Sequence, residues 1–146
     1  MSANDDPVTV LSEDESWRLL SGVSLGRLVT ILGGQAEIFP VNFVTQRRTV
    51  LFRTAQGTKL YSAVMGNWVA FEADYHDAPL TYGWSVIIKG RAQVLSANAD
   101  ILDAEEAPLR SWIATLKPLY VRVIASEITG RRFKFGPEPD RESTFA

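Results

Sequence analysis

The stretch Leu51-Phe52-Arg53-Thr54-Ala55-Gln56-Gly57-Thr58-Lys59-Leu60 carries the chain from a β-rich run, through a turn at a glycine, into an amphipathic helical segment. The first N–H groups of a helix lack intrahelical partners and the helix dipole is positive there, so a phosphate at this junction would meet hydrogen-bond donors. A guanidinium, two hydroxyls and an ammonium group are supplied by Arg53, Thr54, Thr58 and Lys59. The pattern predicts an anion site. The alternative is an ordinary strand-to-helix connection with Thr58 as N-cap, because the stretch contains neither a P-loop nor a G-x-G-x-x-G motif.

Strand-like segments lie on both sides of this stretch. Before it, β-branched and apolar runs predict strands at Leu25–Leu32, Glu37–Thr45 and Thr49–Arg53, with turns between them at residues 33–34 and 46–48. After it, alternating patterns predict strands at Trp68–Tyr75, Trp84–Leu95 and Leu119–Glu127. Gly90, inside the fifth strand, predicts a bulge or a close backbone approach. Short strands joined by tight turns are typical of an antiparallel barrel, so the predicted fold is mainly β.

A few peripheral helices complete the prediction, over residues 12–22, 58–65, 98–106 and 108–116. Ser12 and Glu15 form a capping box that begins the first helix. Asn98 is the predicted N-cap of the third helix, and Pro108 opens the fourth. The chain therefore divides into a flexible lead (residues 1–10), one domain (residues 11–136) and a loose C-terminal tail (residues 137–146).

Composition restricts the possible functions. The chain has 146 residues, of which 46% are hydrophobic and 22% charged, as expected for one globular domain. The net charge of -2 gives no overall attraction to nucleic acid or to an acidic membrane. With no cysteine and one histidine, the chain offers no disulfide, thiolate nucleophile or two-histidine metal centre, so an enzyme of this composition would depend on a cofactor. No apolar run approaches the roughly 18 residues of a membrane span, and residues 1–7 do not form a signal peptide, so we expect a cytoplasmic protein.

Several short motifs, taken in order, point to a known family. They are Leu25-Gly26-Arg27-Leu28-Val29-Thr30, Pro40-Val41-Asn42-Phe43-Val44, Phe52-Arg53-Thr54 with Gly57-Thr58-Lys59, Gly83-Trp84-Ser85-Val86 with Gly90-Arg91-Ala92, and Ile128-Thr129-Gly130-Arg131-Arg132. Together they resemble the pyridoxamine 5′-phosphate oxidase-like, FMN-binding split-barrel superfamily, in its small actinobacterial branch. The resemblance extends over residues 12–135, nearly the whole chain.

This resemblance implies a six-stranded antiparallel split β-barrel that forms a homodimer, with flavin bound in grooves between the two subunits. The phosphate would be bound by Thr54 and Lys59, with Arg53 close by. The segment Pro40, Val41, Asn42 and Phe43 would lie along the isoalloxazine ring, and Trp84 and Ser85 would reach the groove from the partner subunit. Pyridoxamine phosphate oxidases carry further basic and histidine residues near the C-terminus, of which only Arg131 and Arg132 have counterparts here, so oxidation of vitamin B6 is not expected.

The sequence therefore predicts an FMN-binding oxidoreductase that transfers hydride between the flavin and a small-molecule substrate. It identifies no acid–base residue. One alternative is a reductase that uses the deazaflavin F420, although the compact basic cluster suits the single phosphate of FMN better. Another is a flavin- or haem-binding protein without catalytic activity. Trp84 has a second interpretation, as bulk in the core or at the dimer interface. His76 and the carboxylates Glu72, Asp74 and Asp77 are interpreted as solvated residues, not as metal ligands.

Overall fold

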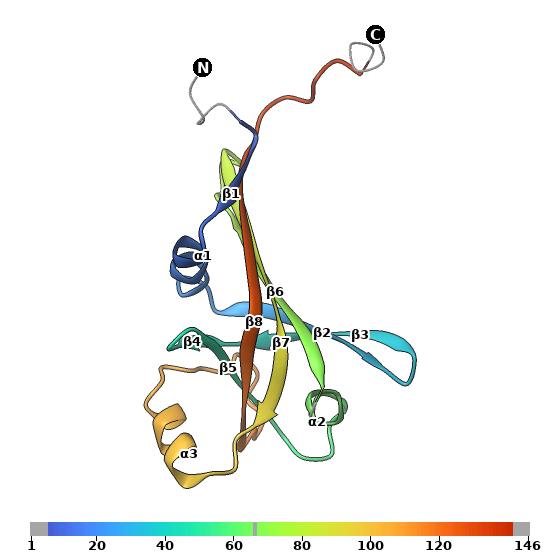
Figure 1. Ribbon diagram of the computed structural model, residues 1–146, viewed down its shortest axis with the longest axis vertical. Helices are drawn as coiled ribbons and strands as arrows, with labels where there is room; N and C mark the ends of the chain where they lie inside the picture. Colours follow the sequence, from blue (N-terminus) through green and yellow to red (C-terminus); the bar gives the residue numbers. More distant parts are fainter. Residues whose placement is uncertain (1–5, 66, 142–146) are drawn as a thin grey trace.

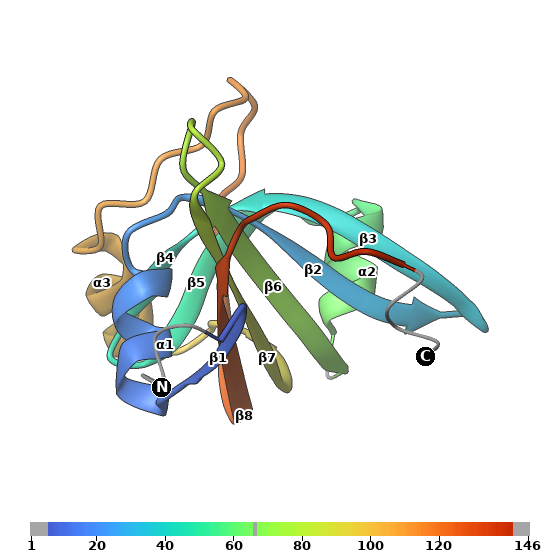
Figure 2. The ribbon, with the colours of Figure 1, turned by 90° about the horizontal axis from the view of Figure 1, so that it is seen from above.

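The computed structural model describes residues 6–65 and 67–141, and this part of the chain forms a single antiparallel sheet (Figure 1). The strands run in the order β3-β2-β6-β7-β8-β5-β4, and β1 pairs with β8. Their bounds are β1 Val8–Leu11, β2 Leu25–Leu32, β3 Gln35–Asn42, β4 Val44–Gln46, β5 Thr49–Thr54, β6 Trp68–His76, β7 Tyr82–Val94 and β8 Leu119–Lys134. The sheet curls into a half-barrel, with the β2–β3 hairpin running across the long strands β6, β7 and β8 (Figure 2).

The mainly-β antiparallel class is confirmed, whereas the strand count is eight among the described residues instead of the predicted six. The predicted strand Glu37–Thr45 is divided at Phe43, which lies between the end of β3 at Asn42 and the start of β4 at Val44. The Phe43 ring is only 1% exposed and its N–H donates to the Ser24 carbonyl at 3.0 Å, so this residue points into the core and leaves the ladder. The second additional strand is β1, which includes residues 8–10 of the predicted flexible lead and pairs with a β8 that extends to Lys134, beyond its predicted end at Glu127.

Two of the helices begin at their predicted caps. Helix α1 (Glu13–Leu20) follows Ser12, whose hydroxyl accepts from the Glu15 N–H at 3.1 Å. Helix α2 (Lys59–Val64) follows Thr58, whose hydroxyl accepts from the Tyr61 N–H, also at 3.1 Å. In both helices the cap satisfies an N–H group that has no intrahelical partner.

The other two helix predictions need correction. Helix α3 (Asn98–Glu105) begins one residue earlier than expected, with Ala97 as the N-cap and no side-chain cap, so Asn98 as N-cap is wrong. The helix predicted for residues 108–116 is absent, and residues 106–118, which we call the strap, are irregular. Trp112, Ile113 and Leu116 have helical spacing, but they are 66%, 66% and 85% exposed, so a helix here would have no core to cover.

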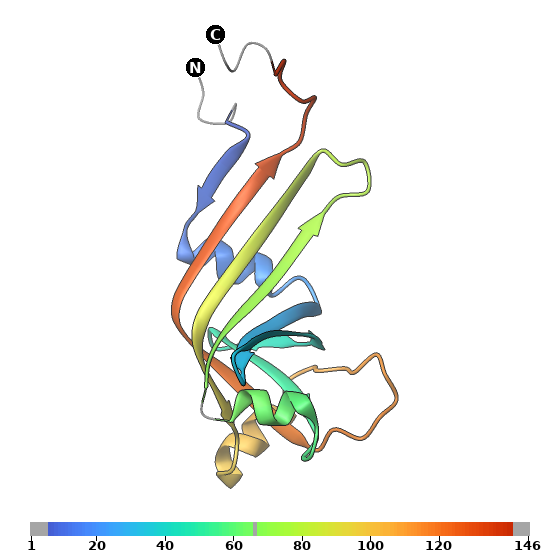
Figure 3. The ribbon, with the colours of Figure 1, turned by 90° about the vertical axis from the view of Figure 1, so that its right-hand side faces the viewer.

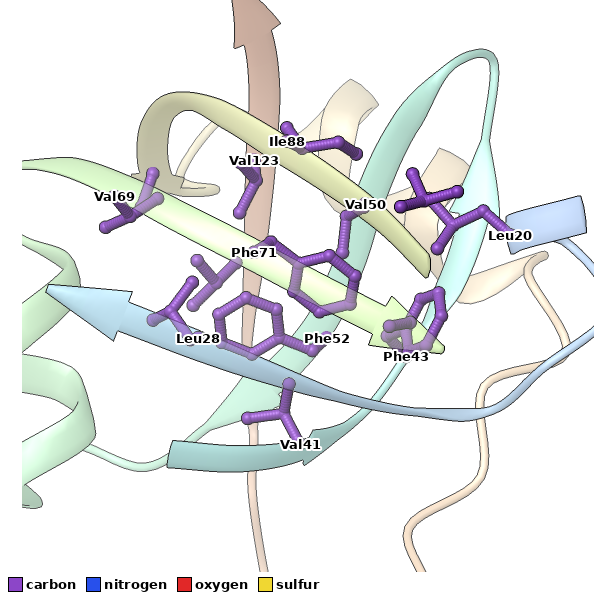
Figure 4. Packing of buried hydrophobic residues seen from close by; sticks show 14 of the residues in the cluster. Leu20, Leu28, Val41, Phe43, Val50, Phe52, Val69, Phe71, Ile88 and Val123 are labelled. Atoms are coloured by element: carbon purple, nitrogen blue, oxygen red, sulfur yellow. The ribbon is translucent and has the colours of Figure 1, made fainter. Parts of the chain in front are cut away.

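The main hydrophobic core lies on the concave face of the sheet (Figure 4). It includes Leu28, Phe52, Phe71 and Ile88, which are all fully buried. Phe43 and Phe71 meet edge to face, with ring centroids 4.7 Å apart. The predicted irregularity at Gly90 is confirmed by a register shift between Lys89 and Gly90 against β8.

The opposite face of β2, β3, β6 and β7, which we call the outer face, carries exposed apolar side chains around a cluster of charged ones. Register pairs across it join Pro40 to Arg27, Arg27 to Glu72 and Glu72 to Ile87. Its apolar members are Val29, Ile31, Ile38, Pro40, Ala70 and Ile87, of which Ile31, Ile38, Pro40 and Ile87 are exposed. Among these apolar side chains, Arg27 contacts the carboxylates of Glu72 at 2.7 Å and Asp74 at 3.5 Å.

Candidate functional site

A groove lies where the ends of β2, β3 and β5 meet helix α2 and the strap; we call it the first groove. Its lining residues are Leu25, Pro40, Val41, Asn42, Arg53, Leu60, Leu109, Arg110, Ser111, Trp112, Ile113 and Lys117. These residues include three cations and no carboxylate. The hollow therefore combines apolar walls with positive charge, which is the character expected of a site for an aromatic anion. Figure 3 shows the strap beside the β5–α2 connection on one side of the sheet.

Arg53 is the predicted anion-binding residue that enters this groove. It is half-buried, and its Nε atom is buried without a hydrogen-bond partner in residues 6–65 and 67–141. A buried hydrogen-bond donor without an acceptor is energetically unfavourable. The Arg53 guanidinium is therefore suited to bind an anionic ligand. Its neighbour Thr54 is buried and does not line the groove, as expected for adjacent residues of a regular strand.

The other residues of the predicted anion site lie outside the groove lining. The Thr54 and Thr58 hydroxyls are hydrogen-bonded to each other at 3.2 Å, and Thr58 also caps helix α2. The Lys59 ammonium forms an ion pair with Glu37 of β3 at 2.7 Å. The structure thus brings Arg53 together with Pro40, Val41 and Asn42, while Thr54, Thr58 and Lys59 do not line the groove.

The remaining predicted site residues have different environments. Val41 lines the groove from a mostly buried position, whereas Phe43 belongs to the core. Trp84 is buried on the core side, with its ring centroid 6.5 Å from that of Tyr75. Ser85 pairs with Asp74 and Arg131 across the sheet. Neither Trp84 nor Ser85 lines the groove of its own chain, and their predicted role was in the site of a partner subunit.

The strap supplies site residues that the sequence did not predict. Arg110, Trp112 and Lys117 line the groove, and the Trp112 N–H donates to Asn42 Oδ1 at 2.9 Å. Lys117 Nζ donates to the Ser111 hydroxyl at 3.0 Å. The run Arg110-Ser111-Trp112 through Lys117, in which basic residues flank an exposed aromatic residue, was the available signal, but its helical spacing obscured it.

A second hollow, the second groove, adjoins the first on the other side of the strap. It is lined by Ser21, Gly22, Val23, Ser24, Phe43, Val44, Pro108, Arg110 and Trp112. Arg110 and Trp112 line both grooves and therefore form the wall between them.

The cluster of Arg27, Glu72 and Asp74 on the outer face contains a carboxyl group with a raised pKa. The pKa of Glu72 is raised to about 7, chiefly by burial and also by the nearby Asp74 carboxylate, while Arg27 opposes both effects. In the part of the chain that the structure describes, this cluster included, no group of three potential metal-ligating side chains is found. His76 is exposed, with Nδ1 2.9 Å from the Asp77 carbonyl oxygen. Within the same residues, no helix is long and apolar enough to cross a membrane.

Comparison with known proteins agrees with this architecture. The family model described as pyridoxamine 5′-phosphate oxidase matches residues 12–132. An uncharacterized protein from Mycobacterium tuberculosis is 61% identical over 103 residues, which cover 70% of this chain and 92% of that protein.

Solved structures extend the comparison. The FAD binding protein from Mycobacterium smegmatis is 51% identical with a TM-score of 0.77, over 87% of this chain and 99% of that one. A conserved protein of unknown function from Corynebacterium diphtheriae is 40% identical with a TM-score of 0.74, over 88% and 99% of the two chains. The resemblance noted in the sequence is therefore confirmed, and the chain belongs to the pyridoxamine 5′-phosphate oxidase family.

Proposed function

We propose that this chain binds a flavin nucleotide in the first groove, as a homodimer, and acts as a flavin-dependent oxidoreductase on a small molecule. The observation that carries the proposal is Arg53, whose Nε is buried without a partner in a groove that contains two further cations and no carboxylate among its described lining residues. A guanidinium placed in this way is a good partner for a phosphate group. The relative from Mycobacterium smegmatis, which is named as an FAD binding protein, supports a flavin as the ligand.

The groove of one chain is too small to enclose such a ligand by itself. Its cavity volume is about 200 Å³, whereas ligand pockets usually measure roughly 300–1,000 Å³. Pro40 both lines the groove and belongs to the exposed outer face, so a second chain packed on that face would extend the groove wall. In this arrangement Ser85 of the partner subunit is the proposed contributor, as the sequence predicted, whereas the predicted contributor Trp84 is buried in the core of its own chain.

The chemistry would come from the flavin, which exchanges hydride with the substrate. The protein's proposed part is to hold the ligand. Arg53 anchors the phosphate, the backbone from Pro40 to Asn42 lies along the ring, and Leu25 and Leu60 exclude water. FMN, which the sequence predicted, contains all of the groups that this groove would hold. FAD contains the same groups and adds an adenosine monophosphate.

The proposal is tested by the absorbance spectrum of the purified chain and by titration of the cofactor-free protein with FMN, FAD and F420. A flavin spectrum, and saturable binding of FMN or FAD that is weakened by Arg53→Ala, are the expected results. A haem or deazaflavin spectrum, or no binding of either flavin, would overturn the proposal. Oxidoreductase activity is then tested by anaerobic reduction of the bound flavin and its reoxidation by candidate acceptors.

A further inference from the structure

We propose that the second groove binds the adenosine half of FAD, and that the strap holds the diphosphate linkage between the two grooves. This inference rests on the proposed function, because it requires the flavin half in the first groove. It assigns a ligand to a hollow that the flavin half would leave free.

The first argument is the arrangement of the two grooves. They share Arg110 and Trp112, so a ligand that crosses the strap passes from one to the other beside these two side chains. FMN ends at its phosphate and would remain in the first groove. A dinucleotide has a second half, joined through the diphosphate, which needs a neighbouring site of this kind.

The second argument is charge. Arg53, Arg110 and Lys117 line the first groove without a carboxylate among the described lining residues, and Arg110 also faces the second groove. This set of cations exceeds the need of one phosphate and suits a diphosphate, in which Arg53 would contact the flavin-side phosphate and Arg110 the adenosine-side phosphate. Lys117 is held near the groove by its hydrogen bond to Ser111.

The third argument is the exposed indole of Trp112. Its backbone N–H is hydrogen-bonded to Asn42 Oδ1 at 2.9 Å, which fixes the residue relative to β3, while 66% of its surface remains exposed. An exposed indole can stack on a nucleobase, as aromatic side chains do in proteins that bind single-stranded nucleic acid, where such stacking contributes substantially to affinity. The hydroxyl residues Ser21 and Ser24 on the opposite side of the second groove are suitable partners for a ribose.

The experiment compares FAD, FMN and AMP on the full-length chain and on variants that alter the second groove. Gly22→Leu is the decisive variant, because Gly22 lines only the second groove and an added Cβ would meet only the Leu19 carbonyl oxygen, at 3.4 Å. Trp112→Ala removes the proposed stacking partner. The matched controls are Gly136→Leu, where an added Cβ meets nothing within 4 Å, and Leu116→Ala, which truncates an exposed strap residue that lines neither groove.

Wild-type protein should bind FAD at least about tenfold more tightly than FMN, and AMP should compete with FAD but not with FMN. Gly22→Leu and Trp112→Ala should weaken FAD binding about tenfold, with FMN affinity unchanged in Gly22→Leu and both controls like wild type. Equal affinities for FMN and FAD, or equal weakening of both by Gly22→Leu, would overturn the inference while leaving flavin binding in place. Failure of both flavins to bind the wild-type chain would instead remove the proposed function.

Discussion

Arg53 reaches the first groove from the end of β5, whereas Lys59 is held by Glu37 outside the groove lining. Replacing Arg53 with alanine should weaken FMN binding by about 1.5–3 kcal/mol, the range for hydrogen bonds to charged groups, and leave riboflavin binding nearly unchanged. Lys59→Ala should have a smaller effect on FMN. Fluorescence titrations with the two flavins measure both differences.

Arg53→Lys is the matched control for Arg53→Ala, because it keeps the charge and loses the fork geometry. It should recover part of the FMN affinity. If riboflavin and FMN weaken by the same factor in Arg53→Ala, Arg53 supports the fold and does not bind the phosphate.

Glu72 makes the stability of the protein depend on pH. Its pKa is raised from 4.5 to about 7, so between these values the folded state keeps a proton that the unfolded state has lost. The free energy of unfolding should therefore fall as the pH rises through this window, and the contribution of Glu72 is fully present only below about pH 4.5. Glu72→Gln should abolish this component and stabilise the protein by about 1–2 kcal/mol above pH 7.

Urea denaturation from pH 5 to pH 8 measures this effect. The exposed Glu127, changed to glutamine, is the control and should leave the pH profile unchanged. A Glu72→Gln profile parallel to that of wild type would show that Glu72 ionises normally in the folded state.

The local rules that predicted Ser12 and Thr58 as caps succeeded because a cap depends on residues within one turn. The Lys59–Glu37 ion pair was not predictable from the sequence in this way. It depends on how helix α2 lies against β3, and residues 37 and 59 are brought together only by the fold.

At the scale of the elements, the bulge at Gly90 leaves no room for a side chain between β7 and the backbone of β8. A Cβ at this position would lie 1.9 Å from the Ile124 carbonyl oxygen, so the backbone of one strand would have to move. Gly90→Ala should therefore destabilise the protein by at least about 2 kcal/mol, measured by urea denaturation. Gly136→Ala, where an added Cβ meets nothing within 4 Å, should change the stability little. A Gly90→Ala variant as stable as wild type would mean that β7 can shift away from β8 without loss of stability.

The strap shows why one element was predicted wrongly. Its apolar residues have the spacing of an amphipathic helix, and spacing indicates a helix only when a core is available on that side. The strap instead satisfies backbone groups individually, as in the Trp112 N–H bond to Asn42, a residue of β3. That partner is distant in the sequence, and for the same reason the sequence did not predict Arg110, Trp112 and Lys117 as lining residues.

At the scale of the whole molecule, the outer face predicts a homodimer. It exposes several isoleucines around the Arg27, Glu72 and Asp74 cluster, and a two-fold axis would let each cluster meet an identical one. Sedimentation at micromolar concentration should give twice the chain mass. Ile38→Glu should produce monomers and weaken flavin binding, because the partner subunit would no longer complete the site.

Leu102→Glu is the control for this prediction. Leu102 is 64% exposed on α3 and Ile38 is 63% exposed on the outer face, so the two substitutions differ in place and not in exposure. Leu102→Glu should remain dimeric. A monomeric wild-type chain, or dissociation by both variants, would exclude the outer face as the specific interface.

The class of the molecule was predictable because alternation along each strand reports which face is buried, as in Val69, Phe71 and Ala73 of β6. The grooves were not predictable to the same degree. Arg53 and Pro40 to Asn42 were found through family motifs, whereas the boundary between the two grooves depends on where an irregular segment lies in space.

Strand β8, with 16 residues, pairs with β1, β5 and β7 and so joins segments from the whole length of the chain. Among the described strands it is also the last to be synthesised. Without β8, one edge of β5 and one edge of β7 have no partner, whereas pairings that do not involve β8, such as the β2–β3 and β6–β7 hairpins, can already form. Productive folding therefore requires β8, and pulse-labelled hydrogen exchange during refolding should show protection in the β6–β7 hairpin before protection in β1 and β5.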